Sequence, residues 1–377
     1  MTTSRDHDLF GGSPGAGLNE GAQNDVYYGR LPPNITDQDN LCPMQEAAPC
    51  RECPTLVYPG GRGFPVAYGS QVRNVTRIEG LKAKGLGNRT MACELSAVGK
   101  PVFNRDSRER YGSWMRDASP PSLLDADKYW YTHERQPRLL FEYSDKDKFD
   151  RKIITRNITL PERHQGNSHV VYNGSFYYHV RGRPEIVRFS LRQGQITHRL
   201  ELPLLAANRS VFLYNSSYTY ADFAVDENGL WVIYALPGNN VGVVKLQSDN
   251  LDVLHTWNIS FQGDSHAKDG DMIMVCGVLY GIKSLTESNT KFSLALDLYT
   301  IQSLPYGDLT FTNPFRQTTM VGYNPRHKEI YSWDKGNQLT YPVKYNALDD
   351  GSSTDEPSLE ALMNAPDYVI TESDENV

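Results

Sequence analysis

Short runs of aromatic and β-branched residues recur from about residue 90 to residue 345, separated by clusters of Gly, Asn, Asp and Pro. Such runs are typical of β-strands, and no stretch repeats its apolar residues convincingly at the helical period. One unit recurs: a strand with a central aromatic or aliphatic pair, a polar turn and a second apolar strand. Its anchor residues lie 46 to 55 positions apart, at Trp130, Phe176, Trp231, Leu279 and Ile330. This spacing matches one four-stranded propeller blade with its loops, so the pattern predicts an all-β fold, a five-bladed β-propeller.

Two Asn-Gly pairs between apolar runs support this fold. They are Asn173-Gly174 in YNGSF and Asn228-Gly229 in VDENGLW. Asn-Gly is the strongest short signal for a two-residue hairpin. Because a turn explains the neighbouring Asp226 and Glu227, we assign neither of them a catalytic role.

The two flanks of this region have a different composition. Residues 1 to about 85 are rich in Gly and Pro without strand alternation, which predicts an irregular stalk or linker over residues 1–87 and a propeller over 88–346. After Lys344 the chain holds nine carboxylates and no Lys or Arg, so residues 347–377 are predicted to be a disordered acidic tail. Without those nine carboxylates the net charge of −7 becomes about +2, which excludes a basic field for nucleic acid.

Glycosylation signals point to an extracellular protein. No stretch approaches the roughly 20 apolar residues of a membrane helix, and the N-terminus shows no secretion leader. The sequence nevertheless contains eight N-x-S/T sequons, more than chance gives, at Asn34, Asn74, Asn88, Asn157, Asn173, Asn208, Asn215 and Asn258. We therefore expect a secreted protein or an ectodomain whose leader or anchor lies upstream. The alternative is a cytoplasmic protein with unused sequons.

The five cysteines fall into two groups. Cys42, Cys50 and Cys53 cluster early, whereas Cys93 and Cys276 are isolated. The early cluster lacks the second ligand pair of a zinc site, which favours interchain or linker disulfides. An odd number leaves at least one thiol free or paired with another chain.

Five segments, in this order, resemble the signature blocks of the olfactomedin domain: GSWMRD, HVVYNGSFYYH, YADFAVDENGLWVIYA, MVCGVLYG and VGYNPRHKEIYSWDKGN. The resemblance covers roughly residues 92 to 346 and implies a five-bladed propeller, in agreement with the repeat. The Gly/Pro-rich stalk and GSWMRD are most similar to the gliomedin and collagen-stalked branch. The resemblance also implies a disulfide between Cys93 and Cys276, which would close a loop of about 180 residues. The alternative is two separate buried thiols.

A channel ion is a further implication of the resemblance. The family's calcium ligands fall on Asp222, on Asp271 with the carbonyl of Met272, and on the carbonyl of Val321 with position 322. Position 322 is Gly322, which has no side-chain oxygen, so water would have to replace one ligand. A companion sodium site falls on Ser168 and His169, which also depart from the pattern. Three alternatives for the channel therefore remain open: it holds calcium, it is empty or holds sodium, or a lysine or a buried water compensates the acids.

Two functions follow as hypotheses. The first is an extracellular interaction module that binds cell-surface receptors or matrix and forms a homo-oligomer through the segment upstream of the propeller. No G-x-S-x-G, H-E-x-x-H or glycine-rich phosphate loop points to an enzyme. The second hypothesis is a propeller hydrolase or lactonase with a channel metal, for which Asp222, Asp271 and His169 are the best residues.

Overall fold

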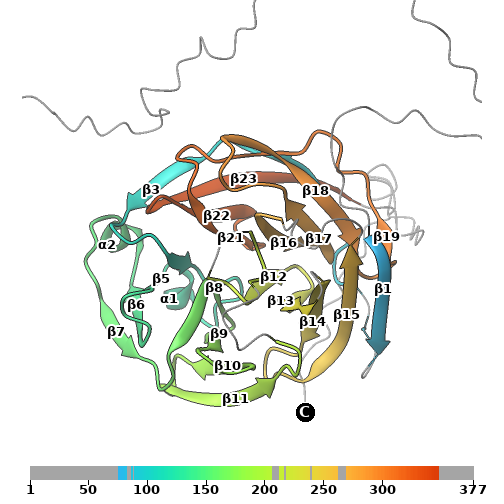
Figure 1. Cartoon of the computed structure of the whole chain (residues 1–377). Helices are drawn as coiled ribbons and strands as arrows, with labels where there is room; N and C mark the ends of the chain where they lie inside the picture. Colours follow the sequence, from blue (N-terminus) through green and yellow to red (C-terminus); the bar gives the residue numbers. More distant parts are fainter. Residues whose placement is uncertain are drawn as a thin grey trace, which may run out of the picture. The chain divides into compact units, whose positions relative to one another are not determined.

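The computed structural model describes residues 75–82, 86–87, 89–205, 212–215, 218–237, 240–261 and 269–347, and of residues 75–82 and 347 only the backbone. All of these residues belong to one compact unit, residues 50–377. Five antiparallel sheets stand around a central axis, as Figure 1 shows. The fold is the predicted all-β, five-bladed propeller.

The blades follow one another along the chain. Blade 1 consists of β4 (Gly112–Met115), β5 (Tyr129–His133), β6 (Leu139–Tyr143) and β7 (Arg156–Thr159). Blade 2 consists of β8 (His164–Tyr172), β9 (Ser175–Val180), β10 (Glu185–Ser190) and β11 (Gln195–Glu201). Blade 3 consists of β12 (Ala221–Asp226), β13 (Gly229–Leu236), β14 (Asn240–Leu246) and β15 (Val253–Phe261), with β1 (Val75–Lys82) added at its outer edge.

The last two blades contain additional short strands. Blade 4 consists of β16 (Asp271–Val275), β17 (Val278–Ile282), β18 (Asn289–Asp297) and β19 (Gln302–Ser303), and β20 (Thr310–Thr312) also pairs with β18. Blade 5 consists of β21 (Thr318–Asn324), β22 (Glu329–Asp334), β23 (Asn337–Ala347) and β2 (Cys93–Val98), and β3 (Val102–Asp106) also pairs with β23. Two short helices, α1 (Leu123–Ala126) and α2 (Lys146–Asp150), connect strands of blade 1. Neither described helix is long and apolar enough to cross a membrane.

Blade 5 closes the ring with strands from both ends of the domain. Strand β2 precedes blade 1 in the chain but pairs with β23, with Cys93 opposite Ala347. The N-terminal part of the domain is therefore built into the last blade, where β2 and β3 pair with the outer side of β23.

Hydrophobic side chains fill the spaces between neighbouring blades. Five clusters of buried residues are present, one for each pair of adjacent blades. The predicted anchors occupy equivalent places, since each lies in the second strand of its blade and is at most 1% exposed: Trp130, Phe176, Trp231, Leu279 and Ile330. The anchor residues of the sequence repeat thus lie in the hydrophobic layers that hold neighbouring blades together.

The two Asn-Gly hairpins differ in detail. Asn173 and Gly174 have positive φ (47° and 66°) and are the two turn residues between β8 and β9, as predicted. In the second hairpin Asp226 pairs with Gly229, so the turn residues are Glu227 and Asn228. Gly229, with φ of 116°, instead begins β13.

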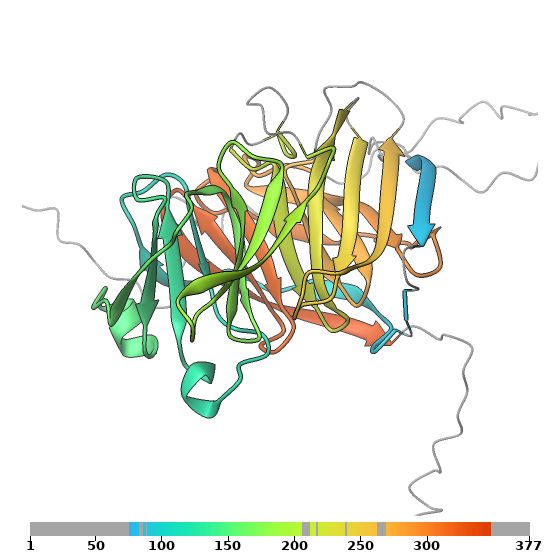
Figure 2. The same ribbon diagram turned by 90° about the horizontal axis from the view of Figure 1, so that it is seen from below.

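One part of the predicted irregular stalk is a strand. Val75–Lys82 forms β1, which pairs antiparallel with β15 from Val75 opposite Phe261 to Lys82 opposite His255. Figure 2 shows β1 beside β15 at the edge of blade 3. The prediction of no strand before residue 85 is therefore wrong for these eight residues. The partner lies more than 170 positions away, and such non-local pairing leaves no local signal in a short segment.

Candidate functional site

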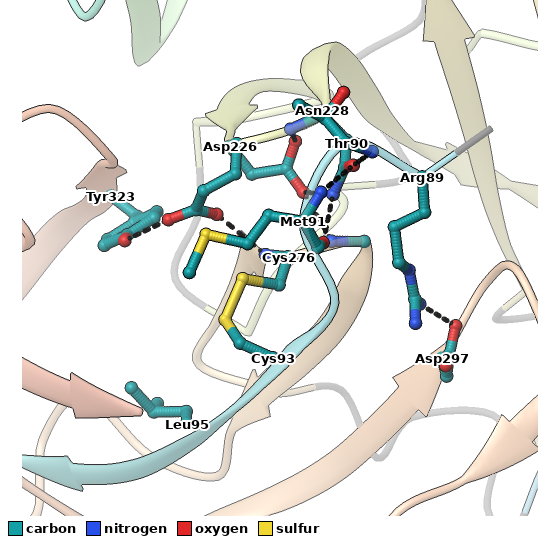
Figure 3. The surroundings of a disulfide bond; sticks show 12 residues. Arg89, Thr90, Met91, Cys93, Leu95, Asp226, Asn228, Cys276, Asp297 and Tyr323 are labelled. Atoms are coloured by element: carbon teal, nitrogen blue, oxygen red, sulfur yellow. Dashed lines mark hydrogen bonds and ion pairs between the residues drawn. A yellow bond between two sulfur atoms is a disulfide. The ribbon is translucent and has the colours of Figure 1, made fainter. Parts of the chain in front are cut away.

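The turn between β16 and β17 carries the disulfide that the resemblance implies. Cys276 and Gly277 are its two turn residues, with φ of 51° and 79°. Cys276 is bonded to Cys93, and both cysteines are fully buried. The bond fixes the start of β2 in blade 5 to blade 4 (Figure 3). An additional Cβ at Gly277 would lie 2.5 Å from the ring of Tyr299, which explains a glycine at the second turn position.

The turn from Asp226 to Asn228 holds this disulfide region in place. Asp226 accepts hydrogen bonds from the backbone N–H of Gly277 (2.5 Å) and from the indole N–H of Trp231 (2.7 Å). The side chain of Asn228 accepts from the backbone N–H of Thr90 (2.7 Å), just before Cys93, as Figure 3 shows. Burial raises the pKa of Asp226 to about 6, although these donors oppose the shift.

Glu227 extends the same contact to a third blade. Its carboxylate accepts from the backbone N–H of Cys276 (2.9 Å) and from the hydroxyl of Tyr323 (2.7 Å) in β21. Residues 226–228, which we call the DEN turn, therefore connect blades 3, 4 and 5. Sequence analysis missed this role because a hairpin turn was a sufficient explanation. One signal was available in the sequence. Asp226, Glu227 and Asn228 are all polar, whereas a two-residue hairpin turn needs only Asn-Gly, so the two acids could have been suspected of a further role.

The predicted channel acids lie on the inner strands, which contact one another around the axis. Asp222 in β12 is 2% exposed and Asp271 in β16 is 1% exposed. Asp271 accepts hydrogen bonds from the backbone N–H groups of Met272 (2.8 Å) and Val321 (3.1 Å). Asp222 accepts one from the hydroxyl of Tyr214. The two carboxyl groups lie close enough together for each to shift the pKa of the other.

Burial governs the protonation of this pair. Burial raises the pKa of Asp222 to about 7. Burial and the adjacent charge of Asp222 together raise the pKa of Asp271 well above its usual range. Two facing carboxylates cannot both keep a negative charge in a dry site, so the pair requires a proton or a cation.

The two residues predicted for a second ion separate in the structure. Ser168 in β8 lines the same cavity as Asp222, and its hydroxyl lowers the pKa of that carboxyl, so Ser168 belongs to the channel site. His169 turns away, because its Nε2 lies 3.2 Å from Nδ1 of the buried His164. Burial lowers the pKa of His169 well below its usual range, so it is neutral. Neighbouring strand residues point to opposite faces, which separates these two side chains, and the pairing of β8 with β9 also shifts register between Gln165 and Val170.

A small cavity adjoins the acids. It has a volume of about 30 Å³ and is lined by Asp222, Ser168, Gly322 and residues of β4. A Cβ added at Gly322 would meet only Cε of Met320, at 3.4 Å. The carboxylates and the hydroxyl are the oxygen ligands that hard cations prefer, and the cavity has room for one or two waters as further ligands. The residues thus fit one such cation, although the described part of the chain contains no cluster of three or more His, Cys, Asp or Glu.

Side chains close the channel beyond the acids. Asn167 in β8 donates a hydrogen bond to the carbonyl of Thr319 in β21 and accepts one from the hydroxyl of Thr219, just before β12. Its side chain therefore spans blades 2, 3 and 5. This bridge covers the channel on the side of Thr219 and Thr319.

Four of the eight sequons lie within the described residues. Asn157, Asn173 and Asn215 are exposed, and Asn258 is partly exposed on β15. The remaining sequons and the early cysteines lie outside the described residues: Asn34, Asn74, Asn88, Asn208, Cys42, Cys50 and Cys53.

These features define a class of protein: a five-bladed propeller that is closed by its N-terminal strand and a disulfide, with an acid pair in its channel. The family model of the olfactomedin-like domain matches residues 88–348. The chain therefore belongs to the olfactomedin-like domain family, as the signature blocks predict. Its placement in the gliomedin and collagen-stalked branch stays a prediction.

Curated relatives include two myocilins. Myocilin from Oryctolagus cuniculus is 32% identical over 263 residues, which are 68% of this chain and 53% of that protein. Myocilin from Homo sapiens is 30% identical over 263 residues, 68% of this chain and 51% of that protein. The chain thus spans about half the length of the curated relatives it matches. Among solved structures, the glutaminyl cyclase of Myxococcus xanthus covers 68% of this chain and 97% of its own, with 10% identity and a TM-score of 0.39, a likeness too low to carry an argument.

Proposed function

We propose that the propeller is an extracellular interaction module that binds a cell-surface receptor or a matrix protein. Membership in the olfactomedin-like domain family is the observation that carries this proposal. The buried disulfide between Cys93 and Cys276 supports it, because such bonds persist in oxidising compartments. Exposed sequons at Asn157, Asn173 and Asn215 are accessible to glycosylation and agree with the same location.

The burial of the channel acids favours the interaction module over the hydrolase hypothesis. A catalytic metal needs a coordination position that substrate can reach. Asp222, Asp271 and His169 are each at most 2% exposed. The cavity beside them, of about 30 Å³, has room for water or an ion but not for an organic substrate.

We further propose that Cys42, Cys50 and Cys53 link several chains, so that the oligomer gains avidity. Replacing all three by serine in the full chain should weaken binding to intact cells or to matrix-coated plates by about 10²- to 10⁴-fold, because linked modules bind with a high effective concentration. The measurement is a binding titration of the secreted protein, with its oligomeric state checked by analytical ultracentrifugation. Equal affinity of the two proteins contradicts the oligomer proposal, and no saturable binding by either contradicts the interaction module.

For the channel we propose one hard cation, calcium or sodium, held by Asp222 and Asp271. Replacing Gly322→Asp should strengthen calcium binding, because it adds a carboxylate beside the acid pair at a position where an added Cβ would meet only Cε of Met320. At calcium concentrations 100 times Kd, binding stabilises the fold by about 2.7 kcal/mol, or about 5–10 °C in Tm. Thermal melts with calcium, sodium or chelator check this.

The matched control is Gly322→Ala, which occupies the same space without an oxygen. Its melting temperature should respond to calcium no more than that of the unchanged protein. An equal calcium response of Gly322→Asp and Gly322→Ala would contradict the ligand assignment. If neither cation changes the melting temperature of the unchanged protein, the proposal of a bound ion is contradicted. A proton shared by Asp222 and Asp271 would then balance their charge.

A further inference from the structure

The outer edge of blade 5 exposes large hydrophobic side chains on a short strand. Val102 and Phe103 in β3 are 53% and 49% exposed. They lie opposite Thr340 and Leu339 of β23, so the strand that carries them is fixed by the sheet. Adjacent residues of a strand point to opposite faces, so Val102 and Phe103 lie on the two sides of the β3 edge, and both are exposed. This edge thus offers apolar surface on an ordered backbone.

Two lysines flank the apolar pair. Lys100 precedes Val102 by two residues, and Lys344 in β23 lies opposite Ala97 of β2. Both are exposed, and within the described residues neither forms an ion pair with a carboxylate. Asp106, at the far end of β3, is already paired with Lys152 at 2.8 Å. We call Lys100, Val102, Phe103 and Lys344 the blade 5 edge patch.

The C-terminal segment of the chain has the complementary composition. Residues 348–377 contain nine carboxylates and no Lys or Arg. Within them, LEALMNAPDYVI (residues 359–370) combines six large apolar residues with two acids. Such a segment gains free energy by covering apolar surface that is bordered by positive charge.

The position of the chain makes this contact reachable. The segment follows β23, whose last residue is Ala347, and Thr340 beside Val102 lies seven residues earlier in the same strand. Seven strand residues span about 24 Å, whereas the ten residues from 348 to 357 reach at most about 35 Å. The tail can therefore return along blade 5 to the patch.

Other exposed hydrophobic residues fit this segment less well. Leu123 and Leu124 on α1 are 88% and 83% exposed, but Asp125 and Asp127 follow them and would repel an acidic segment. Ile153 and Ile154 adjoin cations that are already in ion pairs, namely Lys152 with Asp106, Arg151 with Asp147 and Arg156 with Glu142.

We propose that residues 357–370 dock on the blade 5 edge patch of their own chain. The contact covers Val102 and Phe103 with the apolar residues of the segment. Lys100 and Lys344 face its carboxylates. A partner that binds the outer edge of blade 5 then competes with the tail.

Photo-crosslinking of the full chain tests this contact. Phe103→p-benzoylphenylalanine keeps an aromatic ring at the patch, and Leu124→p-benzoylphenylalanine places the same group at the exposed control position. After irradiation, mass spectrometry should find cross-links from position 103 to residues 357–370, at a yield at least fivefold above that from position 124. Irradiating a mixture of ¹⁵N-labelled and unlabelled protein should give links within one chain. Links mainly between chains, links to other segments, or equal yields at both positions would overturn the proposal.

A second comparison separates the patch from overall charge. Lys100→Glu with Lys344→Glu should reduce the yield at position 103 at least threefold in 50 mM NaCl, because like charges then face each other. Lys283→Glu with Lys335→Glu makes the same change in net charge at two other exposed lysines and should leave the yield unchanged. Thermal melts verify that all variants are folded. An equal loss in both double variants, or no loss in the first, would contradict the assigned surface.

Discussion

Replacing Cys93 and Cys276 together by serine should lower the free energy of unfolding by about 2–5 kcal/mol. The disulfide joins residues 183 positions apart, so its loss frees a very long loop in the unfolded chain. It also removes the covalent bond between β2 of blade 5 and the β16–β17 turn of blade 4. For a domain of this size, the expected fall in Tm is about 5–15 °C. Calorimetry of both proteins under identical conditions measures it.

The hydrogen bonds of the DEN turn still hold the junction between blades after the disulfide is lost. Thr90 and Met91 stay hydrogen-bonded to Asn228, and Cys276 keeps its bond to Glu227. The double variant should therefore keep its fold at 20 °C, with far-UV circular dichroism unchanged. The control replaces Cys42, Cys50 and Cys53, which lie outside the described propeller, and should leave Tm unchanged. A fall below 2 °C in the Cys93 and Cys276 variant would show that the hydrogen bonds alone hold the junction.

The blades were predictable because propeller packing repeats one local requirement. Each second strand needs a large apolar residue between its neighbours, and Trp130, Phe176 and Trp231 satisfy it at nearly regular spacing. Pairing between distant segments leaves no such signature. The sequence of β1 therefore did not reveal its partner β15, and the sequence of β2 did not reveal its partner β23.

The channel site was predictable only in part. Asp271 stands at the edge of an apolar run, which marks it as unusual, but its proximity to Asp222 came from the resemblance. The second ion site at Ser168 and His169 stays a prediction, and the register shift after Gln165 is not visible in the sequence. Beyond that shift His169 contacts His164, whereas Ser168 lies beside Asp222. A bulge changes which face a residue occupies, and alternation alone cannot locate it.

Gly112→Ala should destabilise the propeller by about 1–3 kcal/mol or more, because the site has no room for a methyl group. A Cβ at Gly112 in β4 would lie 2.3 Å from Cη2 of Trp333. Trp333 is fully buried and donates its indole N–H to the carbonyl of Glu109, 3.1 Å away. The ring also packs on Tyr131, with 5.3 Å between centroids. It cannot move aside without disturbing the layer between blades 1 and 5.

Gly322→Ala is the matched control, since Gly322 also lies in an inner strand, β21 of blade 5. Its added Cβ would meet only the flexible end of Met320, and its backbone is not in the left-handed region. The free energy of unfolding should stay within about 0.5 kcal/mol or rise slightly, because alanine restricts the unfolded chain. Urea unfolding of both variants measures the difference. If both variants lose the same free energy of unfolding, neither glycine position tolerates an added side chain. That result would remove the basis for placing a carboxylate at position 322.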